Sequence, residues 1–253
     1  MIRELAKVKH TEHIGSDIYS LWLLSPKISQ QAKPGQFVQV QTSDSFEPFL
    51  CRPISVADVK TNQIRIIFRI RGKGTTILKE KRQGDTLHLL GPLGKPVTQT
   101  KGRTIILCAG GVGIAPLLFL VKELSKNNKI YLYYGARNKS ELILLDQFKP
   151  LCEKIFLTTE DGTIGYKGFI TDLLIHSKDF NPDLLYAAGP LGMLKKISNL
   201  KFKISNLKLF GFLEERMGCG CGICFGCAVK KKDGGYLRVC TDGPAINLKK
   251  IEL

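Results

Sequence analysis

The sequence predicts a small antiparallel β-barrel, a doubly wound α/β domain and a short cysteine-rich segment at the C-terminus. Three observations carry this prediction. Short alternating segments fill the first hundred residues, apolar strands alternate with helices from Thr104 onward, and five of the eight cysteines fall between residues 219 and 240. A length of 253 residues allows two ordinary domains, and a hydrophobic fraction of 43% is typical of a globular protein.

The first hundred residues read as short β segments separated by turns. Several segments alternate apolar and polar residues with a period of two, the pattern of half-buried strands. Pairs such as Pro34-Gly35, Gly84-Asp85 and Gly91-Pro92 mark turns between them. Six short strands at this spacing predict an antiparallel barrel over residues 1–100. The predicted strands are IRELAKV, IYSLWLL, QFVQVQT, PISVADV, QIRIIFRI and DTLHLLG.

A different pattern begins at Thr104. The apolar segment TIILCA leads into a glycine-rich turn, GGVGIAP, and then into the helical segment LLFLVKELSK. Further apolar strands follow, among them KIYLYYGA, KIFLTT and LLYAAGP, with helical segments between them. Strands that alternate with helices predict a parallel, doubly wound sheet over residues 101–213.

The last segment, residues 214–253, is rich in glycine and cysteine. Gly234-Gly235 joins CAVKKK to YLRVC, which predicts a hairpin. A segment of this size cannot bury a core unaided, so we expect a bound cofactor to stabilise it.

The charge of the chain does not by itself identify a partner. The formal net charge is +16, but the 38 Lys and Arg residues are scattered without interleaved aromatics, which argues against nucleic-acid binding. A solvated surface, or a basic face toward nucleotide phosphates or an acidic partner, is the simpler interpretation. The first twenty residues hold no uninterrupted apolar stretch and predict neither a signal peptide nor a spanning helix. We therefore expect a cytoplasmic protein that binds no nucleic acid and no membrane.

The strongest motif is a set of four cysteines near the C-terminus. Their spacing is C-x4-C-x2-C-x12-C, which is the plant-type spacing of a 2Fe-2S cluster. Glycines between them let the backbone fold tightly and direct N–H groups at sulfur. The predicted cluster ligands are Cys219, Cys224, Cys227 and Cys240.

Two other interpretations of the same cysteines stay open. Zinc sites also use two-residue gaps such as Cys221-x2-Cys224, although zinc usually takes a second paired knuckle. A redox dithiol is the third possibility, whereas a disulfide framework does not suit a reducing compartment. Cys221 breaks the spacing and is predicted not to be a ligand. The remaining cysteines, Cys51, Cys108 and Cys152, lie in apolar segments where a free thiol usually packs.

The second motif is the glycine-rich turn between TIILCA and the following helix. Glycines there let backbone amides approach a pyrophosphate at the helix N-terminus. The turn alone is weak evidence. The strand–turn–helix context strengthens it, as does a second turn, YAAGP, at residues 186–190, because ligands bind at the carboxyl ends of parallel strands.

The third motif lies in the predicted barrel, where RPIS at residues 52–55 is followed by IFRIRGKGTT from Ile67. Arg52 can bind a phosphate and Ser55 can hydrogen-bond a ring edge. Backbone and hydroxyl groups around Gly72, Gly74 and Thr75 can cradle a second phosphate. An ordinary edge strand followed by a glycine turn and a helix would have the same sequence pattern.

Taken in order, RPIS, GxGT, GGVGIAP and AGP resemble the ferredoxin-NADP reductase superfamily, and the similarity spans nearly the whole chain. In that superfamily a barrel domain holds a flavin and an α/β domain holds a nicotinamide nucleotide. The closing ERMGCGxGxCxGC, here residues 215–227, narrows the resemblance to the electron-transfer subunits of NAD-linked dihydroorotate dehydrogenase.

The resemblance implies roles for individual residues. It assigns the four cysteines of the predicted cluster to 2Fe-2S. This chain departs from the family pattern at Ala188, where a cysteine is usual, and at Cys51, where an arginine is usual. The residues that it assigns to FAD are Arg52, Pro53, Ile54, Ser55, Ile67, Phe68, Arg69, Gly74 and Thr75. The residues that it assigns to the nicotinamide nucleotide are Gly110, Gly111, Gly113, Ala115, Pro116, Gly189 and Pro190.

The expected function is electron transfer in pyrimidine biosynthesis. A partner subunit with FMN would oxidise dihydroorotate, and electrons would pass through 2Fe-2S and FAD to NAD⁺, in a heterotetramer with two copies of each chain. We expect no catalytic base here, because the four histidines lie away from every motif. They are His10, His13, His88 and His176.

Two rival functions remain at this stage. One is a subunit of an NADPH-dependent ferredoxin or sulfide oxidoreductase, which has the same modular order. The other is a non-enzymatic, zinc-stabilised binding module on a reductase-like scaffold.

Overall fold

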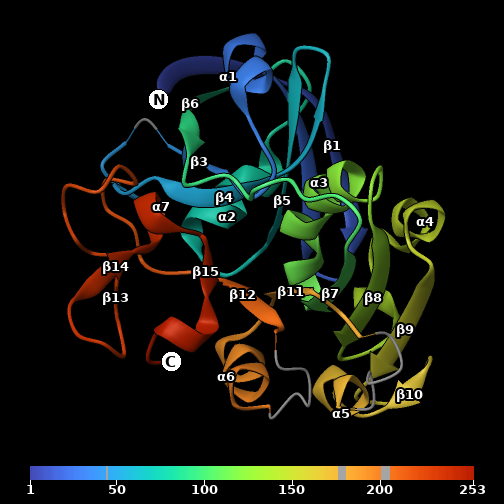
Figure 1. The fold of residues 1–253 in the computed structure, drawn as a ribbon. Coiled ribbons are helices and arrows are strands. Elements are labelled where there is room, and N and C mark those ends of the chain that lie inside the picture. The colour runs from blue at the N-terminus through green and yellow to red at the C-terminus, as the bar shows by residue number, and fades with distance from the viewer. Residues whose placement is uncertain (44, 176–180, 201–205) are drawn as a thin grey trace.

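A computed structural model describes residues 1–43, 45–175, 181–200 and 206–253. In Figure 1 the barrel lies at the top, the mixed sheet at the lower right and the C-terminal segment at the left. His176 falls outside the described residues. Within these ranges, no helix combines the length and the apolar character that crossing a membrane requires.

The predicted six-stranded antiparallel barrel is confirmed. Its strands close in the order β1-β2-β5-β4-β3-β6. Alternate side chains such as Leu21, Leu23, Val38 and Val40 are fully buried, as a period of two requires. The strands are β1 (Ile2–Gly15), β2 (Ile18–Leu24), β3 (Phe37–Gln41), β4 (Arg52–Lys60), β5 (Gln63–Arg69) and β6 (Thr86–Leu93), with two helices, α1 (Pro26–Gln31) and α2 (Lys73–Glu80), between them.

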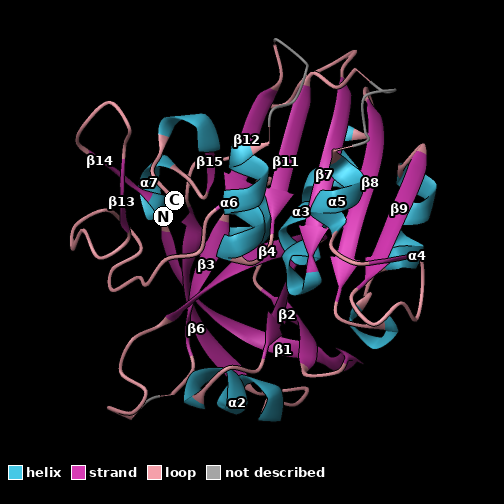
Figure 2. Cartoon of the chain, turned by 90° about the horizontal axis from the view of Figure 1, so that it is seen from below, coloured by secondary structure: helices cyan, strands magenta, loops and turns pink. Residues whose placement is uncertain are grey.

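The α/β domain is built on a seven-stranded sheet in the order β10-β9-β8-β7-β11-β12-β15. All neighbouring strands are parallel except β12 and β15, which are antiparallel. Figure 2 shows the parallel strands side by side. The strands are β7 (Thr104–Gly110), β8 (Lys129–Ala136), β9 (Lys154–Thr159), β10 (Tyr166–Lys167), β11 (Leu184–Ala188), β12 (Lys208–Phe212) and β15 (Ala245–Asn247).

Helices cover both faces of this sheet, so the predicted doubly wound arrangement is confirmed. Helix α3 (Ile114–Leu124) packs on one face with Ile105 and Leu107, and also contacts β4 of the barrel. Helices α5 (Ile170–Leu174) and α6 (Leu191–Asn199) pack on the other face with Ile106 and Cys108. A short helix, α4 (Leu145–Phe148), follows β8.

The C-terminal segment forms the predicted hairpin and then continues into an element that the sequence did not predict. Strands β13 (Ala228–Lys230) and β14 (Tyr236–Arg238) pair antiparallel, with Gly234-Gly235 between them. Helix α7 (Val239–Asp242) follows, and β15 then pairs with β12. The division into residues 1–100, 101–213 and 214–253 therefore remains a prediction, because the last of these ranges supplies an edge strand to the central sheet.

Charged side chains link the barrel to the α/β domain. Lys122 on α3 lies 2.5 Å from the carboxylate of Asp58 on β4, whose side chain is 3% exposed. Arg65 on β5 donates to Gln147 at 3.2 Å, and Arg69 lies 3.1 Å from the carboxylate of Glu141. These contacts hold the two domains in one orientation, because a buried charge that loses its partner is strongly destabilising.

Candidate cofactor sites

A cavity of about 1180 Å³ opens at the carboxyl ends of the parallel strands. The glycine-rich turn after β7 and the Gly189-Pro190 turn after β11 both line it. Because the carboxyl ends of neighbouring parallel strands meet at one edge, the two motifs come together although they are far apart in sequence. Five of the predicted nicotinamide residues lie on this wall, while Ala115 and Pro116 lie in the first turn of α3. The five are Gly110, Gly111, Gly113, Gly189 and Pro190.

The two turns pack so closely that side chains are excluded. A Cβ atom at Gly113 would lie 2.2 Å from the carbonyl oxygen of Ala188, and one at Gly110 would lie 2.9 Å from Cδ of Pro190. The glycines therefore keep the backbone of the turn against the end of β11. The backbone is left open to a ligand in the cavity, which suits a dinucleotide pyrophosphate.

Two buried hydroxyl groups in the cavity wall have no hydrogen-bond partner in the described part of the chain. They belong to Thr158 at the end of β9 and Thr171 in α5, which are 0% and 3% exposed. Buried polar groups are nearly always hydrogen-bonded, so these hydroxyls fit a polar ligand such as a nucleotide. Sequence reasoning missed both residues, although their place at or just after a parallel strand's carboxyl end was a usable signal.

A network of charges forms another part of the wall. Glu141 accepts hydrogen bonds from Arg69 and Arg137, and Arg69 also lies 3.3 Å from Asp17. Burial would raise the pKa of Glu141, but hydrogen bonds from Arg137 and Arg69 hold this pKa below its ordinary value. The Tyr134 hydroxyl donates to the Glu141 backbone carbonyl at 2.9 Å and so fixes the position of this residue. Arg69, assigned to FAD from the resemblance, thus faces the cavity between the domains.

The RPIS and GxGT motifs meet at the start of α2. A Cβ atom at Gly74 would lie 2.5 Å from Nε of Arg52, so the guanidinium group rests on the bare backbone of the helix start. A guanidinium beside a helix N-terminus suits a phosphate group, as an FAD pyrophosphate would supply. The Thr75 hydroxyl accepts from the Arg71 and Gly72 N–H groups at 2.9 and 3.2 Å.

The other predicted FAD residues differ in burial. Ile54 and Phe68 pack in the barrel core, and Ile67 packs in the core shared with α3. Pro53 and Ser55 are only partly buried and lie on β4. The assignment of all five residues to FAD remains a prediction.

The four predicted cluster cysteines lie in two groups, and Cys221 joins the first of them. The thiol of Cys219 lies within hydrogen-bonding reach of those of Cys224 and Cys221, and the thiol of Cys227 lies within reach of that of Cys240. No three His, Cys, Asp or Glu side chains in the described ranges converge on a single metal ion. The C-x4-C-x2-C-x12-C spacing suits a 2Fe-2S cluster, in which each iron takes two thiolates. Cys240 lies in α7, just beyond the return strand on which the sequence placed it.

The loop around Cys219 directs backbone N–H groups at its sulfur. Cys221, Ile223 and Cys224 donate to the Cys219 sulfur at 3.3–3.4 Å. Burial would raise the pKa of the Cys219 thiol, but these N–H groups and Cys224 lower it to about 6. The loop can turn this tightly because Gly220 and Gly222 have φ of +71° and +89°. Such a loop fits a thiolate that binds iron.

The other cysteines lie in less reactive surroundings. Burial raises the pKa of Cys108 and of Cys152 to about 12, and raises the pKa of Cys51 above its ordinary value. These three side chains therefore stay protonated thiols, as the packing interpretation expects. Among the histidines that the structure describes, none lines the cavity.

Gly113→Ala is expected to weaken NADH binding at least tenfold, because its Cβ atom would meet the Ala188 carbonyl oxygen and displace the turn. Gly192→Ala is the matched control, since Gly192 lines the same cavity and a Cβ atom there has nothing within 4 Å. Isothermal titration with NADH measures both. Equal affinities for the two variants would contradict this account of the turn.

Cys221→Ala is expected to leave the iron–sulfur absorption spectrum unchanged, whereas Cys219→Ala abolishes it, because Cys219 fits the cluster spacing that Cys221 breaks, and its sulfur accepts three backbone N–H groups. Absorption and iron content after anaerobic purification measure the difference. If Cys221→Ala abolished the spectrum and Cys219→Ala did not, Cys221 would be the ligand in place of Cys219.

Comparisons with known proteins agree with this geometry. Residues 214–252 match the model of the iron-sulfur cluster binding domain of dihydroorotate dehydrogenase B, and residues 107–199 match that of the oxidoreductase NAD-binding domain. A dihydroorotate dehydrogenase B (NAD(+)) electron transfer subunit homolog from Aquifex aeolicus is 36% identical and covers 100% of both chains. An electron transfer subunit from a Geobacillus species is 36% identical over 99% of this chain and 98% of its own.

Solved structures show the same fold. An NADH-dependent reduced ferredoxin-NADP oxidoreductase superposes with a TM-score of 0.88 and 31% identity, over 98% of this chain and 90% of its own. The cytochrome b5 reductase domain of Ulva prolifera nitrate reductase shares the fold at a TM-score of 0.66 and 17% identity, over 83% of this chain and 97% of its own. On the full-length identity to its relatives, the chain belongs to the family of dihydroorotate dehydrogenase B electron-transfer subunits.

Proposed function

We propose that this chain transfers electrons between a nicotinamide nucleotide and the catalytic subunit of a dihydroorotate dehydrogenase in pyrimidine biosynthesis. The observation that carries the proposal is a set of four cysteines with the spacing of a 2Fe-2S cluster, in one segment that packs on both the barrel and the nucleotide-binding sheet. The cofactors are FAD, a 2Fe-2S cluster and NAD. A bound flavin exchanges one or two electrons, which lets it join a two-electron hydride carrier to a one-electron cluster.

The residues of this chain bind and orient the reactants. The glycine turn at residues 111–113 binds the nucleotide through its backbone N–H groups. The Thr158 and Thr171 hydroxyls supply hydrogen bonds in the same cavity. Arg52 beside Gly74 offers positive charge to the flavin phosphates. The Arg69–Glu141 ion pair keeps the barrel and the α/β domain in register, so that a flavin on one can face a nicotinamide on the other.

Substrate oxidation is assigned to the partner subunit. Removing hydrogen from a carbon acid needs a positioned base, and histidine is the residue that most often serves as one. The described histidines, His10, His13 and His88, lie on β1 and β6 of the barrel, outside the cavity. We therefore propose that an FMN-containing catalytic subunit carries this chemistry and that two copies of each chain form a heterotetramer. A cytoplasmic location remains a prediction from the sequence.

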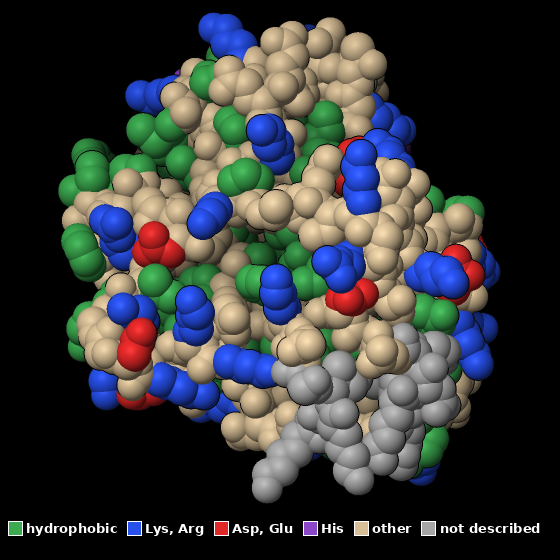
Figure 3. Space-filling view, in the orientation of Figure 1, with side chains coloured by type: hydrophobic (Ala, Val, Ile, Leu, Met, Phe, Trp, Pro, Cys, Tyr) green, Lys and Arg blue, Asp and Glu red, His purple; other side chains and the backbone are tan. Residues whose placement is uncertain are grey.

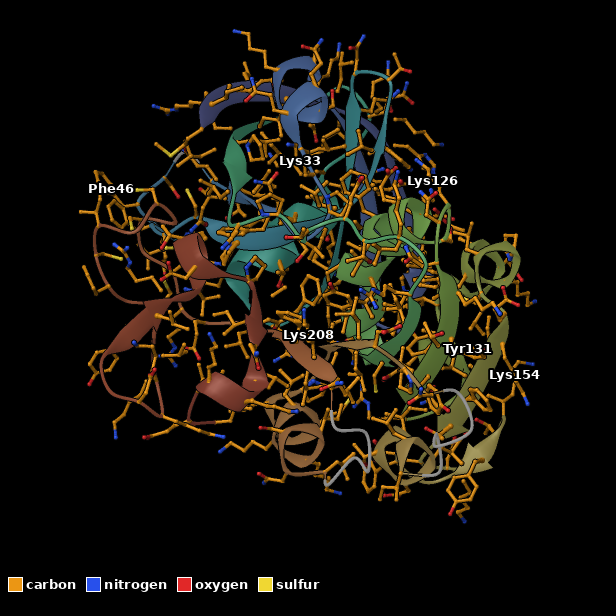
Figure 4. All side chains as sticks on the ribbon, in the orientation of Figure 1. Lys33, Phe46, Lys126, Tyr131, Lys154 and Lys208 are labelled. Carbon is orange, nitrogen blue, oxygen red and sulfur yellow. The ribbon has the colours of Figure 1, made fainter. Side chains whose placement is uncertain are left out.

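The docking surface for that subunit is proposed around Cys224, the exposed member of the four cysteines. Its neighbours Ile223 and Phe225 are 79% and 59% exposed, and apolar side chains that are exposed side by side mark interaction sites. Hydrophobic side chains gather along the left edge of Figure 3, where the C-terminal segment lies. Figure 4 places Phe46, from the loop between β3 and β4, at the same edge. One-electron transfer needs the cluster near the partner's flavin, so this edge suits the contact.

A second candidate function is that of a subunit of a ferredoxin-NADP oxidoreductase. The observation that favours it is the superposition on such an enzyme, with 31% identity over 98% of this chain. The two functions use the same cofactor sites and differ in the partner. Identifying the protein that co-purifies with the chain at its natural abundance separates them.

The division of labour between subunits is testable. The isolated chain is expected to reduce an artificial one-electron acceptor with NADH and to show no dihydroorotate oxidation. Adding an FMN-containing dihydroorotate dehydrogenase subunit is expected to create dihydroorotate-to-NAD⁺ activity. Cys224→Ala is expected to remove that coupling while the acceptor reaction persists, because the flavin and nucleotide sites are intact. Cys221→Ala is the control that retains both reactions.

Dihydroorotate turnover by the isolated chain would refute the proposed division. Failure to couple with any FMN-containing subunit, together with reduction of ferredoxin by NADH or NADPH, would support the second candidate function instead.

A further inference from the structure

Gln39 lies on the outer face of the barrel, beneath the cluster-binding segment. It belongs to β3 and is paired with Pro53 on β4. Its neighbour on the same face, Phe37, packs in one hydrophobic cluster with Leu93, Cys227 and Cys240. This face of β3 is therefore the floor on which the cysteine-rich segment rests. Gln39 is 2% exposed.

The side chain of Gln39 touches the loop that wraps Cys219. A Cβ atom at Gly220 would lie 2.8 Å from Cγ of Gln39 and 2.9 Å from its Nε2 atom. Gly220 directly follows Cys219, whose sulfur accepts three backbone N–H groups from the same loop. The amide of Gln39 thus lies beside the part of the chain that presents a cluster ligand.

Both polar atoms of this amide are buried and have no hydrogen-bond partner among the residues that the structure describes. Other glutamines nearby are satisfied. Gln36 donates to the Gly94 carbonyl at 2.8 Å and accepts from the Lys33 N–H at 2.9 Å, and Gln41 donates to the Ser43 carbonyl at 3.2 Å. An amide with two donors and an acceptor is costly to bury unpaired, so its presence at this place calls for a partner from outside the polypeptide.

We propose that Gln39 is a positioning residue that donates an N–H group to a sulfur atom of the 2Fe-2S cluster and thereby raises its reduction potential. The inference rests on the proposed function, because it requires the cluster. Sulfur gains negative charge when a cluster is reduced, and a hydrogen-bond donor stabilises that charge more than the oxidised form. A barrel residue outside the cysteine motif would then raise the reduction potential of the cluster.

The flavin is the competing partner for this amide. Pro53, opposite Gln39, belongs to the RPIS motif that is predicted to hold FAD. The cluster is favoured because Gly220 touches the amide directly. Separate measurements of the cluster and flavin potentials distinguish the two.

The test uses Gln39→Met and Gln39→Leu in the full chain, purified anaerobically. Both variants keep an apolar volume near that of glutamine and remove the donor, so agreement between them guards against a packing artefact. Gln41→Leu is the matched control, because Gln41 lies on the same strand and face but has a backbone partner. Redox titration followed by electron paramagnetic resonance gives the cluster potential, and flavin absorbance gives the FAD potential.

The Gln39 variants are expected to retain iron, sulfide and FAD, while the equilibrium constant for cluster reduction falls about tenfold, which is about 59 mV for a one-electron couple. The FAD potential of the Gln39 variants should equal that of the wild type. Both potentials of the Gln41→Leu protein should also equal the wild-type values. An unchanged cluster potential would overturn the inference, as would a shift confined to the flavin or a loss of the cluster with FAD retained. Absence of iron and sulfide from the wild-type chain would instead refute the proposed function.

Discussion

The arrangement of the cofactor sites depends on how the C-terminal segment packs. This segment is too small to form a core of its own, and its buried residues share one hydrophobic cluster with β3, β6 and the α/β sheet. Val239, Cys240 and Ile246 are 0–4% exposed and belong to the same hydrophobic cluster as Phe37, Leu93 and Leu209. Strand β15 adds backbone hydrogen bonds to β12. Cys227 and Cys240 are thereby held against the barrel and the nucleotide-binding sheet at once, which suits a path of short electron-transfer steps.

A second constraint acts at the opening between the domains. The glycine turn after β7 can rest on the end of β11 only while residue 113 lacks a side chain, and the Arg69–Glu141 ion pair holds the barrel against this edge. Glu141 also binds Arg137, and the Tyr134 hydroxyl holds its backbone carbonyl. Packing and this ion pair therefore set the geometry of the opening between the domains. This is consistent with a protein whose bound groups supply the reactive chemistry.

The sequence was sufficient for the elements with a strong local pattern. Alternation predicted the barrel strands and the switch at Thr104 predicted the parallel sheet, whereas the cluster ligands remain a prediction from the cysteine spacing. It failed where the signal was short or non-local. Strand β15 has three residues and forms because β12 offers an unpaired edge. Gln39 looks like any polar residue of an alternating strand, and Glu141 looks like a surface carboxylate, until the fold buries both.

The measurement that tests the central claim most directly is the cofactor content of the chain after anaerobic purification. Iron and acid-labile sulfide are assayed together with zinc and FAD. The account predicts about two iron atoms, about two sulfide ions and about one FAD per chain, with zinc absent, because the C-x4-C-x2-C-x12-C spacing is that of a 2Fe-2S cluster. Stoichiometric zinc in place of iron, with no labile sulfide, would contradict it, since no one-electron carrier would then connect the flavin barrel to a partner subunit.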